Sequence, residues 1–163
     1  MEIETEDSTR DETPKAINCI TIFIFYDMAQ GAQSKLSFSD EFRHCNSITF
    51  DGKDWIMLEF DRTGFVMRKI NCSSASKLIK SLRIVKEITA IVTVAVGRRK
   101  RVWWKPWLIR SCNEFARYAA GVDIGWTFNP YSLFKKLIKY NGTTNYKILS
   151  AWRRQDGISR RRQ

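Results

Sequence analysis

The strongest constraint on the fold comes from two long strand-like runs, residues 17–26 and 87–96. Both are rich in β-branched and aromatic residues, which favour buried strands. The chain has 163 residues, which is the length of one domain with a core of its own. We therefore expect a β-sheet at the centre of a single small domain.

Shorter elements are indicated by turn residues. An Asp51-Gly52 pair separates strand-like runs at residues 42–50 and 55–61, and such a pair is a strong hairpin signal. Another short strand is predicted at residues 65–70. Because few crossover helices join these strands, the pattern favours an α+β fold, with a small antiparallel sheet and helices on one side.

Three helices are predicted from apolar spacing and from capping residues. Serines or an Asn-Pro pair begin them, and a glycine ends the second. The predicted helices are residues 75–84 after Ser73 or Ser74, residues 112–120 between Ser111 and Gly121 with Glu114 completing a capping box, and residues 130–140 with Asn129 as the cap and Pro130 in the first turn.

The charge of the chain is unevenly distributed. Residues 1–14 hold six acidic residues and one basic residue, so the remainder carries +16 in a chain of net charge +11. We expect a disordered acidic tail over residues 1–15, one domain over 16–150 and a flexible basic tail over 151–163. The basic body favours contact with a polyanion, either nucleic acid or an anionic wall polymer, but such charge also serves solubility alone.

Several classes of protein have no support in the sequence. No apolar run reaches the ~20 residues that span a bilayer, and the acidic start is not a secretory signal, so the chain is expected to stay in a cytosol. No cofactor or metal site is expected, because there is one histidine and no CxxC pair. In a reducing compartment the four cysteines, Cys19, Cys45, Cys72 and Cys112, are expected to be free thiols.

One cysteine and the single histidine are candidates for chemistry. Cys112 is predicted in the first turn of a helix, where the free N–H groups lower the pKa of a thiol and favour the nucleophilic thiolate. His44 lies on the strand that enters the hairpin. If the two side chains meet, the imidazole can pair with the thiolate and protonate a leaving amine. The alternative is that His44 is a structural or surface residue.

The base in such a pair is usually oriented by a third polar group. With a turn at Gly52-Lys53, the numbers of cross-strand partners add up to 105, so that His44 faces Asp61 and Asn46 faces Glu59. All four side chains then share one face of the sheet. Both carboxylates are candidates, although they could equally face water on a half-buried hairpin.

The order of four segments matches a known pattern: FRHC, GKDWIMLEF, SCNEFARYAAGV and FNPYSLFKKLIKY. In these segments the chain resembles the circularly permuted NlpC-type (papain-like) cysteine peptidases of bacteriophages. Those proteins carry a G-F-x-H-C/V strand, a W-x-x-x-D/E strand, an S/T-C-V-E-x-V-K-x-x-L-G helix and a T-P-x-x-L-x-x-x-L helix. The likeness covers roughly residues 17–140, and this chain departs from it at Asn129-Pro130 and Phe60.

The resemblance implies Cys112 as nucleophile, His44 as base and Glu59, four positions after Trp55, as the third polar residue. It also implies a permuted papain-like fold, in which a partly barrel-like sheet packs against the cysteine helix. The implied function is a phage-encoded cysteine peptidase or amidase acting on a peptide or peptidoglycan-like substrate, in the host cytoplasm or the virion. Acyl transfer on the same thiol is also compatible.

A second function remains open on the ground of charge, namely a virion-associated or nucleic-acid-binding basic protein with an inactive site. The basic and tryptophan-rich residues 98–107 could stack on bases and hold phosphates, line a groove beside Cys112, or pack on the sheet. For the enzyme, Asn113 or backbone N–H groups near Cys112 are candidate donors to an oxyanion.

Overall fold

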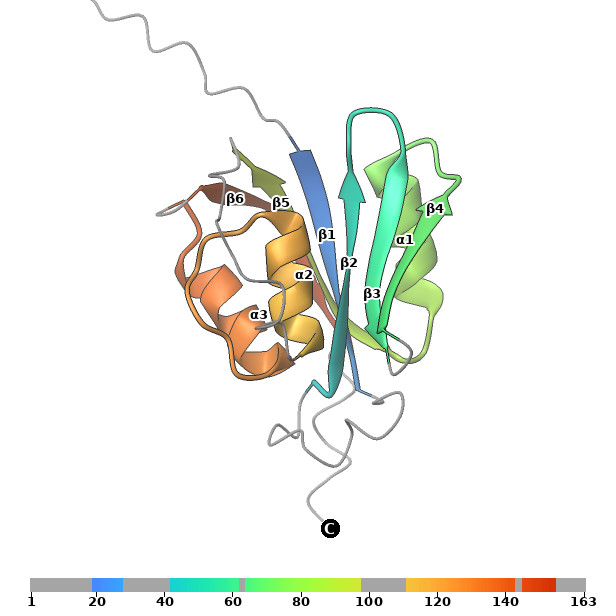
Figure 1. Cartoon of the computed structure of the whole chain (residues 1–163). Coiled ribbons are helices and arrows are strands. Elements are labelled where there is room, and N and C mark those ends of the chain that lie inside the picture. Colours follow the sequence, from blue (N-terminus) through green and yellow to red (C-terminus); the bar gives the residue numbers. More distant parts are fainter. Residues whose placement is uncertain (1–18, 28–41, 62–63, 98–110, 143–144, 155–163) are drawn as a thin grey trace, which may run out of the picture.

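A six-stranded antiparallel sheet forms the centre of the computed structural model, which describes residues 19–27, 42–61, 64–97, 111–142 and 145–154 (Figure 1). The sheet is open, with the strand order β4-β3-β2-β1-β5-β6. The predicted α+β fold with an antiparallel sheet is therefore confirmed. The strands are β1 (Cys19–Tyr26), β2 (His44–Phe50), β3 (Trp55–Asp61), β4 (Gly64–Ile70), β5 (Ile88–Val96) and β6 (Tyr146–Arg153).

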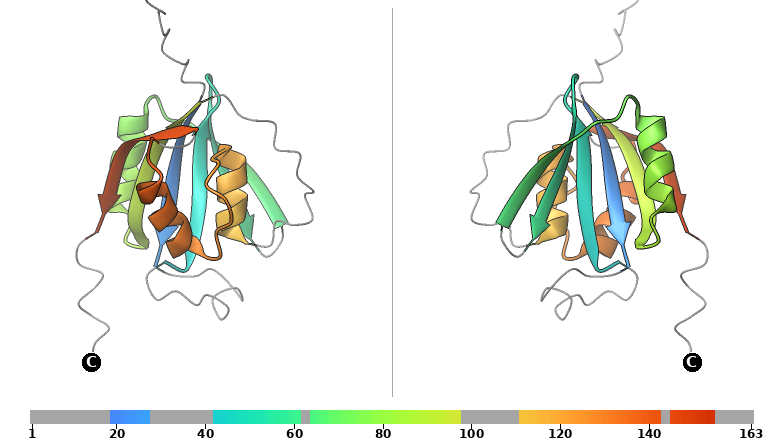
Figure 2. Two further views of the ribbon diagram at one scale, coloured as in Figure 1. Left: turned by 90° about the vertical axis from the view of Figure 1, so that its left-hand side faces the viewer. Right: turned by 90° about the vertical axis from the view of Figure 1, so that its right-hand side faces the viewer.

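The helices cover both faces of the sheet, so the predicted arrangement with all helices on one side is wrong. Figure 2 shows α1 (Ala75–Ile84) on one face, and α2 (Cys112–Ala120) and α3 (Pro130–Lys139) on the other. The physical reason lies in β1 and β5, whose side chains are apolar on both faces and need a cover on each side.

Two apolar clusters result, and each fully buried large side chain in them contributes roughly 1.5–3 kcal/mol relative to exposure. Under α2 and α3 the largest buried side chains are Phe23, Phe25, Phe42, Leu133 and Leu137. Under α1 they are Ile22, Ile24, Ile48, Ile88 and Ile91.

The predicted hairpin joins β2 and β3. Gly52 has a φ of 103°, a conformation that favours glycine, and one carboxylate oxygen of Asp51 accepts from the N–H groups of Lys53 and Asp54 at 2.8 Å each. The turn is thus closed by its own side chain, as the Asp-Gly pair predicts.

The register of this hairpin follows the predicted rule, but over a shorter length than expected. Four pairs form, from Ser47↔Leu58 to Phe50↔Trp55. The expected pairs of His44 with Asp61 and of Asn46 with Glu59 lie outside the ladder, because β3 is paired there with β4 alone. The first three residues of β2 are therefore paired only with β1.

The helix caps follow the sequence closely. Ser74 is the N-cap of α1, Asn129 and Ser132 form a reciprocal capping box at α3, and Gly121 ends α2 with a φ of 70°. Ser111 is the N-cap of α2, but its side chain makes no capping hydrogen bond, so the capping box predicted there with Glu114 does not form.

Strand β6 was not predicted, and its last three residues, 151–153, fall in the segment that was expected to be a flexible basic tail. Its side chains alternate between buried or half-buried and exposed positions, from the buried Tyr146 onward. A strand at the edge of a sheet needs only one apolar face, so a short, charged segment of this kind resembles a loop in sequence. No helix among the described residues is long and apolar enough to cross a membrane. The acidic tail and residues 98–110 lie outside the described residues.

Candidate functional site

Three elements meet at one end of the sheet, the lower end in Figure 1: the end of β1, the start of β2 and the start of α2. His44 is the first residue of β2 and pairs with Tyr26 of β1. Cys112 is the first residue of α2, as predicted. Both side chains are buried, with exposed fractions of 6% for His44 and 5% for Cys112.

Each of these two side chains shifts the pKa of the other. Burial lowers the pKa of His44, but Cys112, Glu59 and Asn46 together outweigh burial and raise it above its ordinary value. His44 in turn helps to lower the pKa of Cys112 well below that of a free thiol. The structure therefore favours a thiolate beside an imidazolium.

Two buried polar atoms of the site make no regular hydrogen bond within the described part of the chain. Nε2 of His44 and Oδ1 of Asn46 are buried without a hydrogen-bond partner in the described part of the chain. Catalytic groups commonly have such loose contacts before a substrate binds. Both atoms are therefore left to pair with a reacting group or with water.

Cys45 is a third member of the site, and the sequence analysis assigned it no role. Its interaction with Cys112 is the largest cause of the lowered pKa of Cys112, while burial and Cys112 raise the pKa of Cys45 itself well above the ordinary value. Cys45 therefore stays a neutral thiol that stabilises the neighbouring thiolate.

Cys112 interacts with both His44 and Cys45, which are consecutive residues of β2. Because side chains alternate along a strand, these two point to opposite faces of the sheet. Cys45 belongs to the cluster beneath α2, whereas the His44 ring lies against Tyr26, with ring centroids 5.7 Å apart. At this point β2 has no paired strand on the side of β3. That unpaired edge lets the first turn of α2 approach both side chains.

Replacing Cys45 with alanine should slow the alkylation of Cys112 near pH 6 by roughly two- to ten-fold, because one neutral hydrogen-bond donor to the thiolate is lost. The rate is measured by iodoacetamide labelling and peptide mass spectrometry. Cys19→Ala, which removes a half-buried cysteine elsewhere on the sheet, is the matched control. Equal rates in the two variants would show that Cys45 does not act on Cys112.

Of the two predicted carboxylates, the structure brings Glu59 to the site. Glu59 is buried, and its charge raises the pKa of His44, though less than Cys112 does. Asp61 ends β3 opposite Gly64, and its side chain lies outside the described part of the structure. Asn46 is buried on the same face as His44 and also raises the pKa of His44. It is thus a second polar neighbour of the imidazole.

Asn113 does not serve as an oxyanion donor in this arrangement. Its side-chain amide donates to the backbone oxygen of Thr127 at 2.5 Å and to the hydroxyl of Thr127 at 2.9 Å, and both residues are buried. The first intrahelical hydrogen bond of α2 runs from Phe115 N to Ser111 O. The backbone N–H groups before it are the remaining candidates from the sequence analysis.

Among the described residues, no group of three or more His, Cys, Asp or Glu side chains could hold a metal ion. No protein-family model, curated protein or solved structure matches this chain.

Proposed function

We propose that this protein is a cysteine amidase or peptidase of the permuted NlpC-type, papain-like class, with Cys112 as nucleophile and His44 as the acid–base residue. The observation that carries the proposal is the meeting of an imidazole and a helix-tip thiol from separate elements, each shifting the other toward its charged form. Perturbed pairs of this kind concentrate at catalytic sites.

The reaction would proceed in two steps. The Cys112 thiolate attacks the carbonyl carbon of the amide, and the His44 imidazolium protonates the departing amine, leaving a thioester on Cys112. His44 then removes a proton from water, and the resulting hydroxide attacks the thioester; the acyl group leaves as a carboxylic acid, and the Cys112 thiolate and the His44 imidazolium are restored. If a second amine takes the place of water, the same site performs acyl transfer.

The neighbours have supporting roles. Glu59 and Asn46 stabilise the imidazolium, and Cys45 stabilises the thiolate, so the ion pair forms before substrate arrives. The N–H groups at the start of α2 point toward the developing oxyanion by the geometry of a helix end. The resemblance in sequence suggests a peptide of the bacterial cell wall as the substrate.

The test of the proposal is the relative reactivity of the cysteines in the folded protein. At pH 6, iodoacetamide should label Cys112 at least about ten-fold faster than Cys19 or Cys72, because the pKa of Cys112 is lowered well below that of a free thiol by Cys45 and His44. Cys19 and Cys72 are both more accessible than Cys112, so exposure alone predicts the opposite order.

If Cys112 reacts no faster than Cys19 and Cys72, the proposed enzymatic function is wrong. In that case the basic protein with an inactive site becomes the better reading, and binding to single-stranded DNA should weaken steeply as salt is raised.

A further inference from the structure

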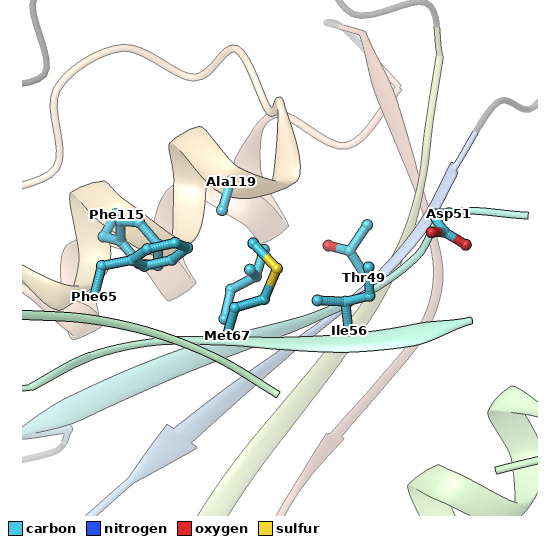
Figure 3. A pocket seen from close by; sticks show the side chains of 8 residues that line it. Thr49, Asp51, Ile56, Phe65, Met67, Phe115 and Ala119 are labelled. Carbon is cyan, nitrogen blue, oxygen red and sulfur yellow. The ribbon is translucent and has the colours of Figure 1, made fainter. Parts of the chain in front are cut away.

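An apolar groove of about 370 Å³ runs beside α2, between this helix and the sheet (Figure 3). That volume lies at the lower end of the range for small-molecule sites, ~300–1,000 Å³. The rings of Phe65 and Phe115 lie at one end, Met67 and Ala119 lie in the middle, and Asp51 lies at the other end. Neither Cys112 nor His44 lines the groove.

The groove and the proposed nucleophile lie along the same face of α2. Cys112, Phe115 and Ala119 are spaced i, i+3 and i+7, so they follow one face of α2. Phe115 lies one turn from Cys112, a rise of about 4.5 Å, and Ala119 lies a further turn away. The aromatic end of the groove is therefore the end next to the thiol, and Asp51 is the distant end.

The side chains that line the groove indicate what kind of chemical group it binds. Phe65 and Met67 on β4 keep 52% and 59% of their surface exposed, and the Phe65 ring meets the Phe115 ring edge-on with centroids 4.8 Å apart. Aromatic rings and a methionine thioether together favour a bulky apolar group. The charged carboxylate of Asp51, whose pKa is lowered by backbone N–H groups, disfavours an anionic group at the far end.

We propose that this groove receives a bulky apolar side chain of the amide substrate and so sets the specificity of Cys112. The inference rests on the proposed function, because it assigns to that enzyme substrates with an aromatic or large aliphatic residue beside the scissile bond. Such a group would cover the exposed rings of the groove while the carbonyl lies at the start of α2. Large exposed apolar surfaces of this kind commonly mark binding sites.

The test compares two electrophiles that differ only in their tails, N-benzyl iodoacetamide and N-methyl iodoacetamide. In the unmodified protein, the benzyl reagent should label Cys112 about ten-fold faster at sub-saturating concentration, since burying a phenyl group supplies that much affinity. Cys72, on the other face of the sheet, is the internal control and should show a ratio near one.

Met67→Lys places a charge in the middle of the groove at an exposed position, and should lower the benzyl preference of Cys112 to about two-fold or less. Phe65→Ala is a second groove variant, which removes apolar surface without adding charge. Ile84→Lys is the matched control, because Ile84 is 77% exposed on α1, across the sheet. Circular dichroism checks that each variant is folded.

The possible failures are distinguishable. If Cys112 reacts rapidly with the methyl reagent but shows no benzyl preference, or if both groove variants keep the preference, the groove has no role in specificity and the enzyme proposal stands. If Cys112 is no faster than Cys72 with either reagent, the proposed function itself fails. A preference lost equally in Ile84→Lys would also overturn the assignment to the groove.

Discussion

Replacing His44 with glutamine is expected to reduce the turnover of an activated ester or amide by roughly 10²- to 10⁴-fold, which is the usual contribution of a general acid–base residue. The substitution keeps a polar side chain of similar size but cannot carry a positive charge or transfer a proton. Release of p-nitrophenolate from p-nitrophenyl acetate measures the rate.

The same variant should shift the pH dependence of Cys112 alkylation. Cys45 and His44 both lower the pKa of Cys112, against burial, which raises it. Losing His44 therefore raises the pKa of Cys112, and the rise in labelling rate moves to higher pH. At high pH, where the thiol ionises in either protein, the two rates should converge.

Asn46→Ala serves as the graded comparison for this experiment. Asn46 is the last of the groups that raise the pKa of His44, so its loss should shift the labelling profile in the same direction by less. An His44→Gln profile that coincides with that of the parent protein would mean that the imidazole does not act on Cys112 in solution.

The largest effect on stability is expected from Phe25→Ala, which should lower the free energy of unfolding by about 3–5 kcal/mol. Phe25 lies on β1, next to the middle of the sheet, and is fully buried. Its ring packs against Phe42 and Phe134, with centroids 5.2 Å and 5.4 Å apart. Alanine would leave a cavity between β1 and α3 that rigid strands cannot close.

Urea denaturation, followed by circular dichroism, measures this loss, which is a large share of the ~5–15 kcal/mol typical of a domain. Phe65→Ala is the control, because the same change at a half-exposed ring should cost about 1 kcal/mol or less. Similar losses in the two variants would place Phe25 outside the well-packed core.

Features that depend on residues close together in the sequence are those that the sequence predicts correctly. The Asp51-Gly52 turn and the bounds of α1 and α2 were predicted correctly, because they depend on neighbours within a few residues. The position of Cys112 at a helix start belongs to the same group, since a cap and an apolar spacing suffice to place it.

Other features depend on contacts between distant segments. The placement of α1 across the sheet, the strand β6 and the early end of the β2–β3 ladder follow from which surfaces each element must cover. The role of Cys45 was not predicted for the same reason. In sequence, a cysteine on a buried strand cannot be distinguished from any small apolar core residue, and only the fold places it beside Cys112.

By itself, the sequence determined the local elements, the thiol at a helix tip and the histidine on a strand. The tertiary structure alone decided that the two side chains lie together, that Cys45 joins them, and that an apolar groove follows the same helix face. The physical reason is that hydrogen-bonded turns and caps are local, whereas the burial that brings α2 onto the unpaired edge of β2 is a property of the whole fold.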